Sequence, residues 1–141
     1  MELKQELIRE FVTPLLQEMK DQEGEYRSEF VKRILKAEKE KPRHRFSSKT
    51  FLKEASWTFM YTLRFGDVFL NSVKRLDRVV QMQLKKKLVK LENGVAKLEP
   101  LHEKLSGKYK IRVGNYRIIL KFISEKKIFL LEVGPRDKIY K

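Results

Sequence analysis

The architecture of this chain follows from residues 108–123, which read KYKIRVGNYRIILKFI. Up to Val113, apolar or aromatic side chains alternate strictly with basic ones, which is the period of a strand with one buried face. Gly114-Asn115 then has the composition of a two-residue hairpin turn. Tyr116–Ile123 returns as a second strand, so the stretch predicts an antiparallel β-hairpin.

The register of this hairpin gathers basic side chains on one face. With Gly114 and Asn115 as the loop, Arg112 lies opposite Arg117, and Lys110 projects from the same face two residues along. Like charges directly opposite each other destabilise a sheet. We therefore expect an exposed cationic surface whose repulsion a bound polyanion relieves. The alternative is a solvated outer face that only keeps the sheet soluble.

Elements on either side extend the hairpin into an α+β domain. Residues 57–65 are rich in aromatic and β-favouring types, which predicts a first strand. Apolar residues over 68–92 recur three or four apart, which predicts a helical pair that Asp67 caps and that breaks near Asp77. Residues 128–133 form a nearly all-apolar strand. The predicted order is β-α-α-β-β-β, with a small antiparallel sheet packed on the helical pair.

The segment before the first strand is expected to be a helical extension. Apolar residues recur every four positions over 2–22, which predicts an amphipathic helix that Pro14 interrupts. A second helix is expected over 28–41. An extended connector should follow over 42–48, and then a short helix over 50–55.

Composition narrows the function. The 141 residues include 33 Lys and Arg against 19 Asp and Glu, a formal charge of +14, and residues 59–141 carry +12 of it. Such an imbalance makes a polyanion the expected partner. Without cysteine and with only two histidines, the chain offers no disulfide scaffold, and we expect no metal and no cofactor. No apolar run is long enough to cross a membrane, so we expect a cytoplasmic protein without a membrane partner.

Three stretches of the second half carry a family resemblance. Residues 104–119 read KLSGKYKIRVGNYRII, residues 133–136 read VGPR, and Ile139-Tyr140 follows. They resemble the RelE/ParE toxin superfamily, with its leucine-glycine loop, basic strand, Gly-Asp/Asn-Tyr-Arg turn, and apolar strand leading to an arginine and a tyrosine. The resemblance covers residues 57–141 and implies a RelE-like toxin domain of the element order predicted above.

The RelE-like branch consists of ribonucleases of type II toxin–antitoxin systems, which cut messenger RNA in the ribosomal decoding site and so inhibit translation. The resemblance implies that Lys110 and Arg112 help to activate the ribose 2′-hydroxyl. It implies that Arg117 binds the scissile phosphate and that Arg136 lies near the leaving 5′-oxygen. Attack of a 2′-hydroxyl on its own 3′-phosphate needs such charge stabilisation and an in-line geometry.

Further residues are expected to contact messenger RNA and ribosomal RNA. Tyr140 matches the aromatic side chain that stacks on an mRNA base, a contact worth about 1–3 kcal/mol in single-strand binders. Lys108 and Lys138 complete the predicted RNA contacts. The Lys85–Lys87 run is interpreted as a solvated helix face or a contact to ribosomal RNA, and His102 as a surface residue or an aid to proton transfer.

Two alternatives stay open. The ParE-like branch of the superfamily inhibits DNA gyrase and lacks the nuclease residues. Separately, residues 29–55 look like the C-terminal part of a RelB-type antitoxin, which suggests an antitoxin-like segment over 1–56 fused to a toxin domain over 57–141. Such a segment would inhibit the toxin in cis or on a neighbouring copy, or make the fusion an inactive regulatory binding protein. It could instead support folding or a homodimer through the N-terminal helices, with an antitoxin acting in trans.

Overall fold

The computed structural model describes residues 21–46 and 60–141. Its elements, in chain order, are α3 (Ser28–Glu38), β1 (His44–Phe46), β2 (Thr62–Phe65), α4 (Asp67–Lys74), α5 (Arg78–Glu92), β3 (Glu99–Pro100), the 3-10 turn η3 (Glu103–Leu105), β4 (Lys108–Val113), β5 (Tyr116–Ser124), β6 (Lys127–Pro135) and α6 (Arg136–Ile139). The predicted helix at 50–55 and residues 2–20 of the predicted helix at 2–22 lie outside the described residues. The last two residues of the latter, Asp21 and Gln22, are described and are not helical. Among the residues that are described, no helix combines the length and the apolar character that a membrane crossing requires.

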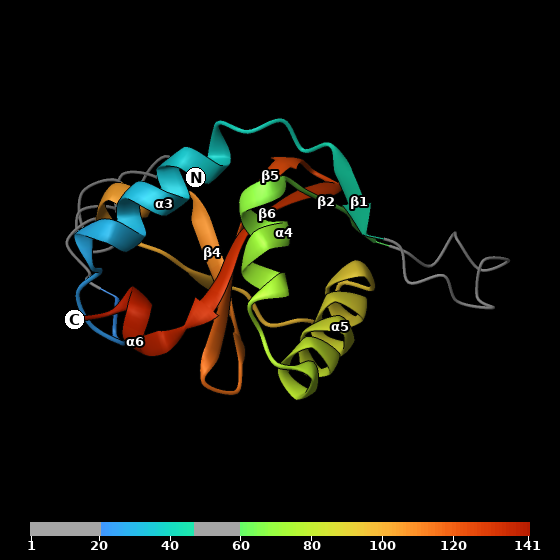
Figure 1. The fold of residues 1–141 in the computed structure, drawn as a ribbon. Coiled ribbons are helices and arrows are strands. Elements are labelled where there is room, and N and C mark those ends of the chain that lie inside the picture. Colours follow the sequence, from blue (N-terminus) through green and yellow to red (C-terminus); the bar gives the residue numbers. More distant parts are fainter. Residues whose placement is uncertain (1–20, 47–59) are drawn as a thin grey trace, which may run out of the picture.

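A mixed six-stranded sheet forms the centre of the molecule, in the order β1-β2-β6-β5-β4-β3 (Figure 1). The predicted α+β class is confirmed, but the expectation of a wholly antiparallel sheet is wrong, because β2 runs parallel to β6. The chain passes through α4 and α5 after β2, and a crossover of this kind allows parallel pairing. The other neighbouring strands are antiparallel.

The hairpin of β4 and β5 has the predicted register, with Arg112 paired to Arg117 and Val113 paired to Tyr116. The helical pair also breaks where the sequence indicates. Asp77 caps α5, because its carboxylate accepts a hydrogen bond from the backbone N–H of Val80 at 2.9 Å. Local patterns were therefore sufficient to place these elements.

The cap of α4 differs from the prediction. The Glu40 carboxylate, from the segment after α3, accepts hydrogen bonds from the backbone N–H groups of Asp67 and Val68 at 2.9 and 3.1 Å. The carboxylate of Asp67 instead bonds to the side chains of Arg43 and His44. The first turn of α4 is thus capped by the N-terminal segment.

Apolar side chains of β5 and β6 alternate between two clusters, one on each face of the sheet. Leu120 and Leu130 pack with the residues of α4 and α5. Ile119 packs with Phe30 and Ile34 of α3, both of which are completely buried. α3 therefore belongs to the hydrophobic core of the sheet.

Substituting Ile34 tests the contribution of α3 to the core. Ile34→Ala removes a fully buried side chain, so we expect the free energy of unfolding to fall by about 3 kcal/mol, in a single transition. Urea unfolding followed by circular dichroism measures this loss. Lys32→Ala, at an exposed position of the same helix, is the matched control and should change stability little. A loss below about 1 kcal/mol in Ile34→Ala would contradict the assignment.

Candidate functional site

The structure brings the predicted catalytic residues and Tyr140 together near the hairpin end of the sheet. Lys110 and Arg112 lie on β4, Arg117 lies on β5, and Arg136 begins α6 directly after β6. The ammonium group of Lys110 lies 5.0 Å from the centre of the Tyr140 ring, and the guanidinium group of Arg136 lies 5.1 Å from it. Residues far apart in the sequence thus form one cationic cluster around a tyrosine.

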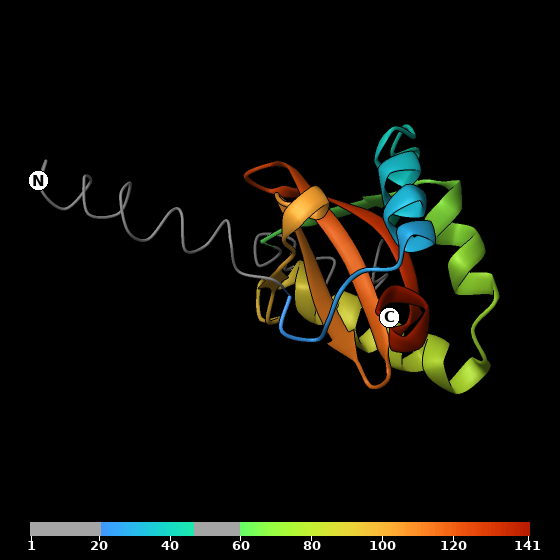
Figure 2. The same cartoon turned by 90° about the vertical axis from the view of Figure 1, so that its left-hand side faces the viewer.

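This cluster is covered, contrary to the expectation of an exposed cationic face. Residues 21–27, which we call the strap, cross β4 and β5 before the chain enters α3 (Figure 2). The side chains of Lys110 and Arg117 are only 2% and 6% exposed. Two acidic residues of the strap supply the charge that makes this burial feasible.

Asp21 is the first of these acids. Its carboxylate accepts hydrogen bonds from the ammonium group of Lys110 at 2.7 and 2.9 Å and from the hydroxyl group of Tyr140 at 2.7 Å. The hydroxyl group of Tyr26 donates a further bond at 2.9 Å. Burial raises the pKa of Asp21, but these hydrogen bonds outweigh it, so the pKa lies below its ordinary value and the carboxylate is ionised.

Glu23 is the second acid, and four cations surround it. Its carboxylate accepts hydrogen bonds from Nη2 and Nε of Arg117 at 2.5 and 3.1 Å and from Nζ of Lys110 at 2.5 Å. The Nε atoms of Arg136 and Arg112 lie at 3.5 and 3.9 Å. Burial raises the pKa of Glu23, but the bonds and charges of Arg117 and Lys110 hold it well below its usual range.

The hairpin itself fixes the orientation of Arg117. Its Nη1 atom donates hydrogen bonds to the backbone carbonyl oxygens of Gly114 and Tyr116, both at 2.9 Å. Arg112 on the neighbouring strand is half-exposed and pairs with Glu99 of β3 at 2.9 Å. Arg117 is thus held rigidly toward the strap, whereas Arg112 stays at the rim of the cluster.

The strap is joined to the C-terminal segment by backbone contacts. The N–H of Arg27 donates to the carbonyl oxygen of Ile139 at 2.8 Å, and the N–H of Lys141 donates to that of Glu25 at 3.0 Å. Gly24 has φ +133°, and a Cβ atom there would lie 3.8 Å from the Tyr140 side chain. The turn between Asp21 and Gly24 therefore needs a glycine in this conformation.

The predicted RNA-binding residues have different surroundings. Tyr140 is 1% exposed, so its ring has no free face for a base while the strap is in place, and burial and Asp21 raise the pKa of its hydroxyl group. Lys108 is also buried and pairs with Glu38 of α3 at 3.2 Å. Lys138 is exposed at the surface of α6.

Part of the basic run on α5 lies close to the cluster. Lys86 and Lys87 line an open cavity of about 290 Å³ together with Lys90 and Arg112. Arg112 thus links the covered cluster to a cationic surface that the strap leaves open. The placement is compatible with both interpretations of the run, as a solvated face or as a contact to RNA.

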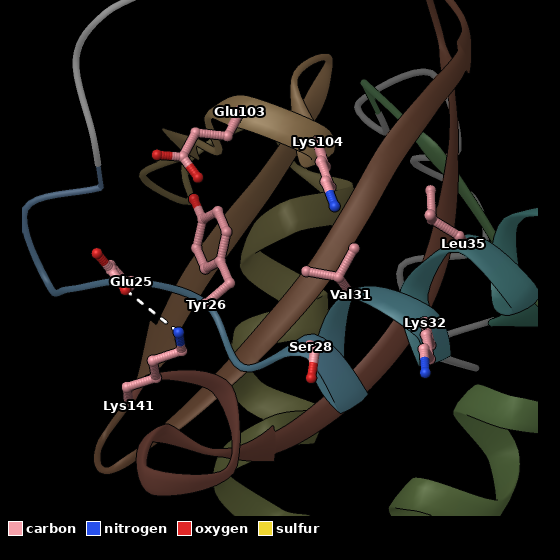
Figure 3. A pocket seen from close by; sticks show the side chains of 9 residues that line it. All are labelled: Glu25, Tyr26, Ser28, Val31, Lys32, Leu35, Glu103, Lys104 and Lys141. Carbon is pink, nitrogen blue, oxygen red and sulfur yellow. Dashed lines mark hydrogen bonds and ion pairs between the residues drawn. The ribbon is translucent and has the colours of Figure 1, made fainter.

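A second cavity, of about 530 Å³, lies beside the strap and contains none of the predicted site residues (Figure 3). Glu25 and Tyr26 of the strap, Val31 of α3 and Lys104 of η3 are among the residues that line it. Figure 3 also shows the exposed ion pair between Glu25 and Lys141, at 3.3 Å. The strap is therefore bordered by open space on this side.

Sequence reasoning missed Asp21 and Glu23 as site residues. The stretch Asp21–Glu25 reads DQEGE and concentrates acids just before a helix, which is a visible signal. Its partners lie about 90 residues further along, however, and no local spacing indicates them. Only the tertiary structure joins these acids to the hairpin.

The chain was compared with protein-family models, curated proteins and solved structures. No protein-family model matches it, and neither does any curated protein. A chain of the toxin–antitoxin complex RelBE2 from Mycobacterium tuberculosis is 21% identical with a TM-score of 0.42, over 53% of this chain and 96% of that chain. A chain of the RelB–RelE antitoxin–toxin complex from Methanococcus jannaschii is 19% identical with a TM-score of 0.44, over 51% and 88%.

The strap acids should make stability depend on pH. The pKa values of Asp21 and Glu23 lie below their ordinary values of 3.8 and 4.5, so the unfolded chain binds more protons than the folded chain in acid. The free energy of unfolding should therefore fall as the pH decreases below about 4.5, and Asp21→Asn/Glu23→Gln should flatten this fall. Urea unfolding at several pH values between about 5 and 2 measures the slope.

Glu29→Gln is the control for this experiment, because Glu29 is exposed in the first turn of α3. It should keep the slope of the unchanged protein. Equal slopes in the double variant and the unchanged protein would show that the strap acids are not held in ion pairs in solution.

Proposed function

We propose that this protein is the toxin component of a type II toxin–antitoxin system, and that its cationic cluster cleaves messenger RNA on the ribosome. The observation that supports this most strongly is the convergence of Lys110, Arg117 and Arg136 on the carboxylate of Glu23. A phosphodiester group has the same charge of −1 and likewise presents two oxygens that can each accept hydrogen bonds. A site that holds a carboxylate in this way is suited to hold a phosphate.

The chemistry proposed for this site is transfer of a phosphoryl group within the RNA chain. The 2′-hydroxyl group gives up its proton as its oxygen attacks the adjacent phosphorus atom. The bond between phosphorus and the 5′-oxygen breaks, and a proton is delivered to this leaving oxygen. Arg117, fixed by the carbonyl groups of the hairpin, stabilises the charge that develops on the phosphorane. Lys110 and Arg112 assist activation of the 2′-hydroxyl, and Arg136 lies on the side of the leaving oxygen.

The strap restricts this function in the state described by the structure. Glu23 occupies the cluster, and Tyr140 is buried by the same segment, so RNA cannot reach either without displacing the strap. This observation also favours a second candidate function, in which the fused chain is a non-catalytic regulatory binding protein. The two functions differ in whether RNA is ever cleaved.

Cleavage of messenger RNA on translating ribosomes tests the proposal. Purified full-length protein is added, and primer extension maps the new RNA ends. The experiment is carried out in two backgrounds, the protein with the unchanged strap and the protein with the substitutions Asp21→Asn/Glu23→Gln. We expect cuts in the decoding site, and Arg117→Ala should reduce the cleavage rate by about 100-fold or more, because it removes the main stabiliser of the developing charge. Arg136→Ala should also reduce the rate.

Lys32→Ala is the matched control, because it removes an exposed cation of α3 outside the cluster. It should leave the cleavage rate unchanged. Absence of cuts in both strap backgrounds would contradict the ribonuclease and leave the regulatory binding protein. Growth arrest that persists in Arg117→Ala would favour a toxin of the ParE type, which inhibition of gyrase supercoiling would then identify.

A further inference from the structure

The cluster at the hairpin gathers four cations around three carboxylates, those of Asp21, Glu23 and Glu99. Arg112 and Arg117 are directly opposed on neighbouring strands, an arrangement that destabilises a sheet. Lys110 and Arg117 are almost completely buried, which carries a large desolvation cost. Apolar residues of similar size would satisfy the fold at least as well. The stability of the sheet therefore does not explain why these residues are cationic.

The contacts made by the strap show which chemical groups the cluster holds in this structure. Glu23 receives two nitrogen atoms of Arg117, in the fork geometry with which arginine recognises carboxylates and phosphates. Asp21 receives Lys110 and the hydroxyl group of Tyr140 at a second position beside the first. The cluster thus holds two anionic groups from one short segment of chain.

We propose that Asp21 and Glu23 are an internal pseudosubstrate, whose carboxylates occupy the positions that two consecutive phosphates of single-stranded RNA take when the strap is displaced. This inference rests on the proposed function and specifies both the ligand and the regulation of the same site. The chain inhibits itself by mimicking its substrate. RNA and the strap then compete for Lys110, Arg117 and the face of Tyr140.

The backbone allows the two acids to leave without unfolding the domain. Both lie on the turn Asp21–Gly24, which is closed by a hydrogen bond of 3.0 Å from the N–H of Gly24 to the carbonyl oxygen of Asp21. The next residues are joined to the C-terminal segment, and α3 is anchored by Phe30 and Ile34 in the core. The turn can therefore lift while the rest of the N-terminal segment stays in place.

Binding of a short RNA tests the pseudosubstrate. The probe is the dinucleotide pUpU, measured by calorimetry on the full chain, with pyrophosphate and the deoxyribose dinucleotide as comparison probes. Asp21→Asn/Glu23→Gln should bind pUpU at least tenfold more tightly than the unchanged protein, because the competing charges are gone. Glu29→Gln removes an exposed acid of α3 and should leave the affinity unchanged.

A second variant keeps every charge. It tests the pseudosubstrate even if the double variant Asp21→Asn/Glu23→Gln does not fold. Gly24→Ala strains the turn at φ +133° while both acids and all cations remain. It should tighten pUpU binding by about threefold or more, because the strained turn holds its acids less firmly. Gly107→Ala is the matched control. Gly107 also has a positive φ, +90°, but it lies in the loop before β4, where an added Cβ atom would meet nothing within 4 Å beyond its chain neighbours.

The outcomes separate this inference from the proposed function. Unchanged affinity in both Gly24→Ala and Asp21→Asn/Glu23→Gln would overturn the pseudosubstrate, even if RNA is cleaved. Tighter binding without cleavage would support the pseudosubstrate and contradict the ribonuclease. Equal gains for pyrophosphate and pUpU would overturn the assignment of RNA as the specific ligand.

Discussion

The ion pairs of Lys110 and Arg117 with Asp21 and Glu23 hold the two halves of this structure together. Two cations buried on a sheet face would be very unfavourable alone, because the cost of removing each from water is several kcal/mol. The strap compensates this cost with ionised carboxylates and places them within hydrogen-bonding distance. The same contacts bury Tyr140 and hold the C-terminal segment against the N-terminal one. Removing the strap would therefore change both the electrostatics and the packing of the site.

The N-terminal segment is tied to the sheet by more than the strap. Glu38 of α3 pairs with Lys108 and Lys121, and Arg33 pairs with the buried Glu132 of β6. The side chain of Glu40 caps α4. Glu38 thus compensates cations of the strongly basic second part, and Arg33 compensates an acid of that part. The segment contributes to the hydrophobic core, the helix caps and the charge balance together, and this explains how it can hold the strap in a defined position.

Sheet stability and the proposed function make opposite demands on the hairpin face. A stable sheet would avoid Arg opposite Arg, whereas a phosphate site needs cations gathered and fixed before the ligand arrives. In the proposed function the strap reconciles these demands, since it supplies anions while no RNA is bound. The strap leaves part of the cationic surface open. Arg112, at the rim, is continuous with Lys86 and Lys87 of α5, so cationic character persists beside the covered cluster.

Local sequence patterns were enough to define the hairpin of β4 and β5 and the helices α4 and α5, but not β1, β3 or α6. Strict alternation up to Val113, followed by the Gly114-Asn115 turn, set the hairpin register and placed Lys110, Arg112 and Arg117 on one side. Asp77 marked the break between α4 and α5. These features follow from periods of two and 3.6 residues and from turn and cap chemistry, which act over a few neighbours. The parallel pairing of β2 with β6, and the burial of the cationic face under Asp21 and Glu23, emerge only in the folded chain. Both depend on contacts between residues about 65 to 95 positions apart, and an attraction between opposite charges leaves no spacing in the sequence that identifies the partners.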